Sequence, residues 1–144
     1  MTGNVPILIV EDDQVCVMAI RRALRKLDLQ NPIRVARDGL EALELLRGGA
    51  GREPMAAPFV VLLDINMPRM NGHEFLAEIR RDPVLRPLVV FVLSTSDSPE
   101  DVRRAYAHNV AGYLLKADLC GSLSAALSMV DSFARAIVFP AVRG

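Results

Sequence analysis

The chain has few cysteines, no excess of either charge and no long apolar run, and each shortage excludes a class of protein. Its 144 residues include two cysteines, Cys16 and Cys120, which are too few for a disulfide framework. Both lie among apolar neighbours, so we expect reduced thiols in the core. Seventeen Lys and Arg residues balance seventeen Asp and Glu residues, without a basic block. We therefore expect neither a nucleic acid nor a membrane surface as partner.

The apolar segments are also too short to cross a membrane. The amino terminus lacks the charged segment and apolar core of a signal peptide, so we expect a soluble, cytoplasmic protein. About half of the residues are apolar (51%), which is enough to build one core. A second folded module has no room, so we expect a single domain over residues 1–144.

Strand and helix patterns alternate five times along the chain. Apolar runs predict strands, and the segments between them carry apolar residues at intervals of three and four, which is typical of amphipathic helices. The predicted strands are residues 5–10, 32–36, 59–63, 88–93 and 110–115. Since crossovers between parallel strands are right-handed, this order predicts an α/β fold. We expect a three-layer αβα sandwich around a five-stranded parallel sheet.

Turn and cap signals divide these elements. Residues 47–58 are rich in Gly, Ala and Pro without a period and predict a mobile surface connection. Ser98 is a predicted helix N-cap, with Pro99 in the first helical position. We interpret Asp13 and Asp118 as ordinary helix caps.

Charged residues follow three of the apolar runs. Glu11 and Asp12 follow the first, Asp64 the third and Lys116 the fifth. Because the carboxyl ends of parallel strands line one edge of a sheet, we expect these charges to converge in one cleft. Neighbouring carboxylates repel each other unless they are protonated or bind a hard cation, and Mg²⁺ suits a shallow site. Asp12 and Asp64 are the expected direct ligands.

A carboxylate at the end of the most hydrophobic strand can also act as a nucleophile. Attack by Asp64 on phosphorus would form an acyl phosphate whose charge the Lys116 ammonium would balance. Ser94 directly follows the fourth strand and is the hydroxyl that we expect in this site, ahead of Thr95 and Ser96. Taken alone, these hydroxyls are better explained as turn residues. Only the expected proximity of these hydroxyls to Asp64 and Lys116 favours their assignment to the site.

Together these segments resemble the receiver domain of two-component response regulators, over nearly the whole chain. The motifs are Ile-Val-Glu11-Asp12, Asp64-Ile-Asn-Met-Pro68 with Asn71-Gly72, a strand ending in Ser94-Thr95, and Gly112-Tyr113-Leu-Leu-Lys116. Each motif is weak alone, but all of them in this order on these strands are specific. The resemblance implies the flavodoxin-like (βα)5 receiver fold.

The resemblance also implies the roles of the site residues. Asp64 would accept a phosphoryl group from a phosphohistidine of a sensor histidine kinase or phosphotransfer protein, in a self-catalysed transfer with slow loss of phosphate rather than enzymatic turnover. The implied Mg²⁺ ligands are Glu11, Asp12, Asp64 and the Asn66 carbonyl, and the implied phosphate-binding residues are Lys116, Ser94 and Thr95.

Ser94 and Tyr113 stand where receivers carry their switch residues. Phosphorylation adds about −1.5 to −2 charges at the sheet edge, Ser94 can bond the new oxygens, and Tyr113 can fill the volume that is freed. The result would be a reshaped protein-interaction surface. Without the family, Tyr113 is better explained as an amphipathic ring that closes the sheet edge.

One departure from the receiver pattern follows Lys116. Ala117 occupies a position where most receivers have Pro after a cis peptide bond, and a cis bond before Ala would cost about 3 kcal/mol or more. We therefore expect a trans or strained loop. Receivers associated with bacterial phytochrome kinases often share this loss and carry an apolar tail, which residues 133–144 resemble. This suggests a phytochrome-type kinase as partner.

The apolar tail also suggests a homodimer. Apolar surface that is left exposed marks an interface, so Phe133, Ile137 and Phe139 are candidate interface residues. The alternative is that the tail folds back onto its own domain or frays.

Other function classes fit the residues less well. An Asp-nucleophile phosphohydrolase needs a second acid two residues after the nucleophile, where this chain has Asn66. A phosphorylation-independent scaffold would not need the complete set of Glu11, Asp12, Asp64 and Lys116. A flavodoxin-like cofactor binder needs a phosphate-binding loop after the first strand, and acids stand there instead.

Overall fold

Five parallel strands form a single sheet in the computed structural model, which describes residues 5–49, 51, 53, 59–116 and 122–140. Their order across the sheet is β2-β1-β3-β4-β5, so β3 is central, as its hydrophobicity predicts. The strands are β1 (Ile7–Val10), β2 (Ile33–Ala36), β3 (Val60–Leu63), β4 (Val89–Ser94) and β5 (Gly112–Leu115). The predicted α/β class and parallel sheet are confirmed.

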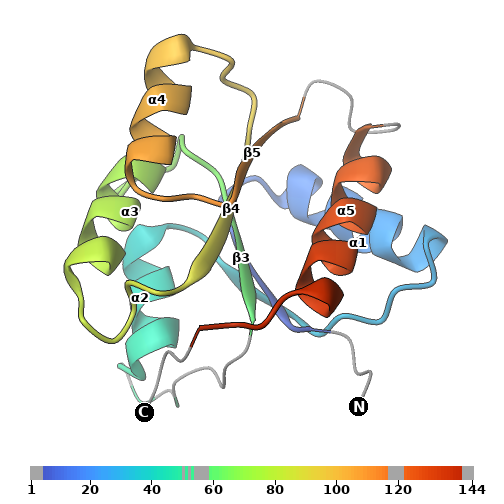
Figure 1. Cartoon of the computed structure of the whole chain (residues 1–144), viewed down its shortest axis with the longest axis horizontal. Helices are drawn as coiled ribbons and strands as arrows, with labels where there is room; N and C mark the ends of the chain where they lie inside the picture. The colour runs from blue at the N-terminus through green and yellow to red at the C-terminus, as the bar shows by residue number, and fades with distance from the viewer. Residues whose placement is uncertain (1–4, 50, 52, 54–58, 117–121, 141–144) are drawn as a thin grey trace.

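Helices cover both faces of this sheet. They are α1 (Gln14–Lys26), α2 (Gly39–Arg47), α3 (Gly72–Arg81), α4 (Pro99–Ala107) and α5 (Ser122–Ala136). α1 and α5 lie on one face, and α2, α3 and α4 lie on the other (Figure 1). The three predicted layers are therefore present. Among the described residues, no helix is long and apolar enough to span a membrane.

The core consists of two clusters, one on each face of the sheet. Alternate residues of β1 enter different clusters: Leu8 and Val10 pack towards α2 and α3, while Ile7 and Ile9 pack towards α1 and α5. All residues of β1 and β3 are buried. Because these strands are buried on both faces, their sequences are continuous apolar runs and do not alternate between apolar and polar residues.

Most of the predicted helix starts are confirmed. The side chain of Asp13 accepts a hydrogen bond from the Val15 N–H at 2.9 Å and caps α1. Ser98 caps α4, with Pro99 in the first turn. The helix α2 includes Arg47, so the predicted 47–58 connection begins one residue later, at the left-handed Gly48. Most of that connection lies outside the described residues, as do Ala117, Asp118 and Cys120.

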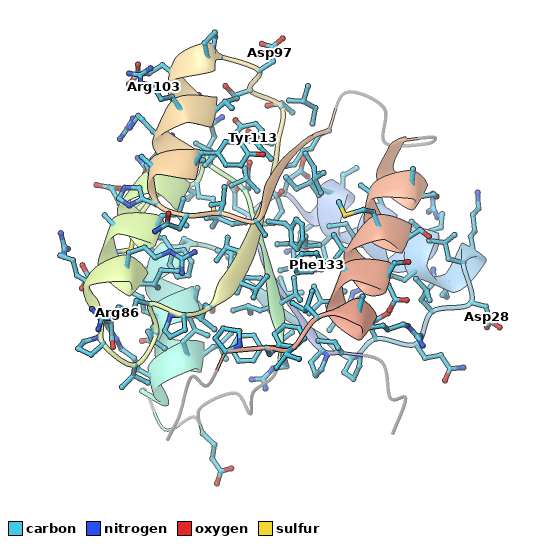
Figure 2. The ribbon with its side chains drawn as sticks, viewed as in Figure 1. Asp28, Arg86, Asp97, Arg103, Tyr113 and Phe133 are labelled. Atoms are coloured by element: carbon cyan, nitrogen blue, oxygen red, sulfur yellow. The ribbon has the colours of Figure 1, made fainter. Side chains whose placement is uncertain are left out.

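The predicted apolar tail begins inside α5, which continues to Ala136, and the rings in its described part pack against their own domain. The Phe133 ring meets Phe91 edge to face, with ring centroids 5.2 Å apart, on the sheet side of α5 (Figure 2). Phe139 packs against the same cluster and Ile137 is half-buried, whereas Val138 is 96% exposed. Phe133 and Phe139 therefore pack on their own domain, as the fold-back alternative expects. The homodimer stays a prediction.

Candidate functional site

The sheet register brings the predicted charges to one edge. Val10 pairs with Leu63, so Glu11 and Asp64 follow neighbouring strand ends, and the Asp64 N–H donates to the Val10 carbonyl at 2.9 Å. On the other side of β3, the Lys116 N–H donates to the Ser94 carbonyl at 2.8 Å. The register therefore brings the ends of β1, β3 and β5, which carry the four predicted charges, to one edge of the sheet.

Three carboxylates meet at this edge. Oxygen atoms of Glu11, Asp12 and Asp64 all lie within 4.8 Å of one another, and no other such group occurs among the described residues. Glu11 and Asp64 are 2% and 6% exposed, whereas Asp12 faces solvent. Two buried carboxylates and one open side provide hard oxygen ligands and room for water, which fits Mg²⁺ or Mn²⁺.

The Lys116 ammonium lies between two of these acids. Its Nζ donates a hydrogen bond to Oε1 of Glu11 and lies 3.6 Å from Oδ1 of Asp64. The Lys116 side chain is only 9% exposed. Burial lowers the pKa of this amine, but the hydrogen bond to Glu11 and the charge of Asp64 outweigh it and raise the pKa above its usual value. Lys116 therefore stays protonated and supplies a permanent positive charge to the site.

Burial makes Asp64 a basic carboxylate. Desolvation, followed by the nearby negative charge of Glu11, raises the pKa of Asp64 to about 6. Lys116 and a hydrogen bond from the Asn66 N–H act in the opposite direction but do not cancel this rise. A positive charge bound by the carboxylates would lower the pKa again, so cation binding and ionisation of Asp64 are coupled.

The loop after Asp64 passes directly over the first turn of α3. The Gly72 N–H donates to the Ile65 carbonyl at 2.8 Å. A Cβ on Gly72 would lie 2.6 Å from the Asp64 carbonyl oxygen and 2.7 Å from Cα of Ile65, so only glycine fits here. Asn71 precedes this turn and forms a capping box with Glu74. Backbone packing therefore fixes the position of Asp64 relative to α3.

A strained residue anchors the same loop to α2. Arg69 has a φ of 63°, and the Met70 N–H bonds the Pro68 carbonyl across it at 2.7 Å. The Arg69 guanidinium binds Asp38, the N-cap of α2, at 2.7 Å. Hydrogen bonds from the Glu41 N–H and from Arg69 outweigh the burial of Asp38 and lower the pKa of its carboxyl.

The predicted hydroxyl and aromatic residues lie on the β4 side of the site. Ser94 is fully buried, and its Oγ accepts a hydrogen bond from the Ser96 N–H at 3.1 Å. Thr95 is exposed next to it. Tyr113 is half-buried on the side of the sheet that faces α4, and its hydroxyl donates to the Ser96 carbonyl at 2.8 Å (Figure 2). The two switch candidates therefore contact the same loop residue.

Sequence reasoning missed two sets of residues around the site. Cys16 lies in the first turn of α1, buried near Glu11 and Lys116, and burial raises the pKa of its thiol to about 12. Its apolar neighbours indicate burial but not this location. Ser96, Asp101 and His73 form a hydrogen-bonded series from β4 to α3. A Ser-rich turn and an acid in a first helical turn are too common to reveal it.

Comparison with known proteins gives a consistent family. The response regulator receiver domain model matches residues 7–127. The chain is 45% identical to the probable methanogenesis regulatory protein FilR2 of Methanothrix harundinacea, over 76% of this chain and 70% of that protein. It is 33% identical to the response regulator Rcp1 of Synechocystis sp., over 88% of this chain and 86% of that protein.

Solved structures agree with this similarity. The Mn²⁺-bound form of Rcp1 superposes with a TM-score of 0.82 at 32% identity, covering 96% of this chain and 100% of that chain. The phosphorylated cyanobacterial phytochrome response regulator RcpA superposes with a TM-score of 0.85 at 31% identity, with the same coverage of both chains.

Proposed function

Because the chain belongs to the response regulator receiver family, we propose that Asp64 accepts a phosphoryl group from the phosphohistidine of a sensor histidine kinase. One observation carries this proposal: a buried carboxylate lies within 4.8 Å of two further acids and 3.6 Å from a buried ammonium. This arrangement supplies both a nucleophile and the positive charge that a transferred phosphoryl group needs.

The transfer would proceed by in-line displacement. An oxygen of the Asp64 carboxylate would form the new O–P bond while the N–P bond to the donor imidazole breaks, and the released imidazole nitrogen would take a proton from solvent. Lys116 would move from Glu11 towards the phosphoryl oxygens. Glu11, Asp12, Asp64 and the Asn66 carbonyl would hold Mg²⁺, which supplies charge neutralisation to the phosphoryl oxygens.

The response would be a change of surface rather than turnover catalysis. The Ser94 hydroxyl, with Thr95 beside it, would bond the phosphoryl oxygens. Tyr113 would follow, since both Ser94 and Tyr113 contact Ser96. The surface formed by α4, β5 and α5 would then bind a protein partner or a second copy of the chain.

A phytochrome-type kinase is the partner class that the relatives favour. Rcp1 and RcpA are response regulators, and RcpA is a phytochrome response regulator by name. Residues 133–140 extend beyond the matched receiver segment, as the tail of such receivers does. Val138, the large apolar side chain that is 96% exposed in the described part of this tail, is one that a second copy could cover.

Phosphotransfer from a donor tests the proposal. A histidine kinase core carrying labelled phosphohistidine should pass its label to the wild-type chain within minutes in Mg²⁺, and Asp64→Asn should receive none. Ser94→Ala should accept the label but show a weaker structural response. Label on Asp64→Asn would move the acceptor elsewhere, and a complete Ser94→Ala response would remove Ser94 from the switch.

A further inference from the structure

The helix α4 is held to the domain by little apolar contact. Among its nine residues only Ala105 is buried, and Tyr106 is 48% exposed. Arg103 extends from α4 into solvent, and Asp97 lies on the loop that leads into the helix (Figure 2). One buried alanine and the half-buried Val102 stabilise a helix weakly, so polar contacts contribute to its position.

A histidine fixes the first turn of α4 to α3. Nε2 of His73 lies 2.9 Å from Oδ1 of Asp101, and the second carboxylate oxygen accepts a hydrogen bond from Oγ of Ser96 at 2.6 Å. An ionised carboxylate only accepts, so Nε2 of His73 carries the proton. The hydrogen bonds from Ser96 and His73 lower the pKa of Asp101, which keeps it in this form. His73 itself is only 5% exposed.

An arginine fixes the other end of α4. The Arg80 guanidinium donates to the carbonyls of His108 at 2.6 Å and Asn109 at 3.1 Å, directly after the helix. It also donates to the Arg86 and Leu88 carbonyls at 2.5 Å and 2.9 Å. These partners are backbone atoms outside residues 94–96.

The two contacts come from one face of α3. His73 and Arg80 are seven residues apart, close to two helical turns, so their side chains project in the same direction. The contact at the first turn of α4 depends on the position of Ser96, and Ser96 in turn contacts both switch candidates, Ser94 and Tyr113. The Arg80 contact at the last turn of α4 does not depend on Ser96.

We propose that His73 is a positioning residue for the Ser94 switch. With Asp101 and Ser96 it forms a latch that holds the first turn of α4, and release of this latch lets α4 pivot about Arg80. The trigger rests on the proposed function: when the Ser94 hydroxyl turns towards a phosphoryl group on Asp64, the Ser96 N–H loses its acceptor. The loop then moves, and the Ser96 bond to Asp101 breaks with it.

Amide hydrogen exchange of the unphosphorylated protein tests the latch itself. His73→Leu removes the bond to Asp101 and keeps an apolar side chain in the buried site. Exchange at Val102 and Arg103 should rise about tenfold or more, since tenfold is the lower end of the effect expected for one lost hydrogen bond to a charged group. Exchange at Tyr106 and Ala107 should change less than about twofold, because Arg80 still holds that end.

Two further variants separate the latch from general damage. His73→Gln can place an amide donor close to Nε2 and should restore most of the wild-type protection. Glu100→Gln removes the neighbouring exposed ion pair with Arg103 on the same helix, and exchange should change less than about threefold. Equal loss of protection along all of α4 in His73→Leu, or no loss at all, would overturn the latch.

Phosphorylation by acetyl phosphate tests the coupling. In the wild type, addition of one phosphoryl group should raise exchange at Val102 and Arg103, and in His73→Leu it should cause no further rise. A phosphorylated wild type with unchanged exchange there would overturn the coupling while leaving the proposed function intact. Absence of any phosphoryl group would instead contradict the proposed function, and the measurement on the unphosphorylated protein would still decide the latch.

Discussion

Lys116 donates its hydrogen bond to Glu11 rather than to Asp64. Its Nζ lies 3.6 Å from Oδ1 of Asp64, so the ammonium must shift before it can bind a group on that oxygen. Glu11 also belongs to the acidic group, so a bound cation and the ammonium compete for the same carboxylate. Cation binding at Glu11 would therefore release Lys116 towards Asp64.

Removal of the Glu11 charge should weaken cation binding. We predict that Glu11→Gln lowers the affinity for Mg²⁺ by about tenfold or more, because one of three hard ligands is neutralised. Isothermal titration with Mg²⁺ measures this affinity. Asp13→Asn is the matched control, because Asp13 lies two residues after Glu11 and caps α1. Loss of the Asp13 charge should change the Mg²⁺ affinity by less than about threefold. Equal losses in both variants would mean that the site responds only to total charge.

Neutralisation of Asp64 should stabilise the Mg²⁺-free protein at neutral pH. The folded-state pKa of Asp64 is raised from 3.8 to about 6, so between these values the folded state holds more protons than the unfolded state. Stability therefore falls as pH rises through this window, and the loss is complete above about pH 6. Asp64→Asn should gain about 1 to 3 kcal/mol in free energy of unfolding at about pH 7.5.

Urea unfolding in chelator measures this gain. The advantage of Asp64→Asn should vanish at about pH 4, because the wild-type carboxyl is then protonated in the folded state. Saturating Mg²⁺ should stabilise the wild type more than the variant. If the stability gain of Asp64→Asn were the same at both pH values, its cause would be something other than the charge of Asp64.

Gly72 should not tolerate a side chain. We predict that Gly72→Ala destabilises the protein by about 2 kcal/mol or more and slows phosphoryl acceptance, since its Cβ would lie 2.6 Å from the Asp64 carbonyl oxygen. Thermal unfolding and the rate of acetyl phosphate labelling measure both effects. At Gly49 the nearest atom to an added Cβ is 3.9 Å away, so Gly49→Ala should leave the labelling rate unchanged. Equal effects at the two positions would contradict the close approach.

The packed and exposed residues of the tail should behave differently. Phe133→Ala should cost about 2 to 4 kcal/mol of stability, because the ring packs edge to face on Phe91. Val138→Ala should cost less than about 0.5 kcal/mol, because the side chain is 96% exposed. Urea unfolding of the two variants compares them. A small effect of Phe133→Ala would mean that this end of α5 does not pack on Phe91 in solution.

The same exposed residue tests the predicted homodimer. If a second copy covers Val138, then Val138→Asp should weaken self-association by about tenfold or more in sedimentation velocity, because a charge would be buried. Val138→Ser has a similar exposure without the charge and should weaken it less. Unchanged association in Val138→Asp would place the interface away from this part of the tail.

The sheet and the acidic site could be predicted from the sequence, because apolar runs mark the strands and the residues that end these runs mark the edge of the sheet. In a parallel sheet, an apolar run that stops at Asp64 or Lys116 fixes where the charge lies, and no knowledge of side-chain packing is needed. The contacts of His73 and Arg80 depend on the rotation of α3 and its distance from α4, which local patterns do not encode. The tail shows the same limit: Phe133 and Phe139 suit a dimer interface as well as their own core, and only packing distinguishes the two.

Intact mass of the wild type and of Asp64→Asn after incubation with acetyl phosphate, with and without Mg²⁺, tests the central claim most directly. We predict one phosphoryl group on the wild type, which requires Mg²⁺, is released by hydroxylamine and is absent from Asp64→Asn. A wild type that gains no phosphoryl group from acetyl phosphate or from phosphohistidine donors would contradict the account and favour a scaffold that works without phosphorylation.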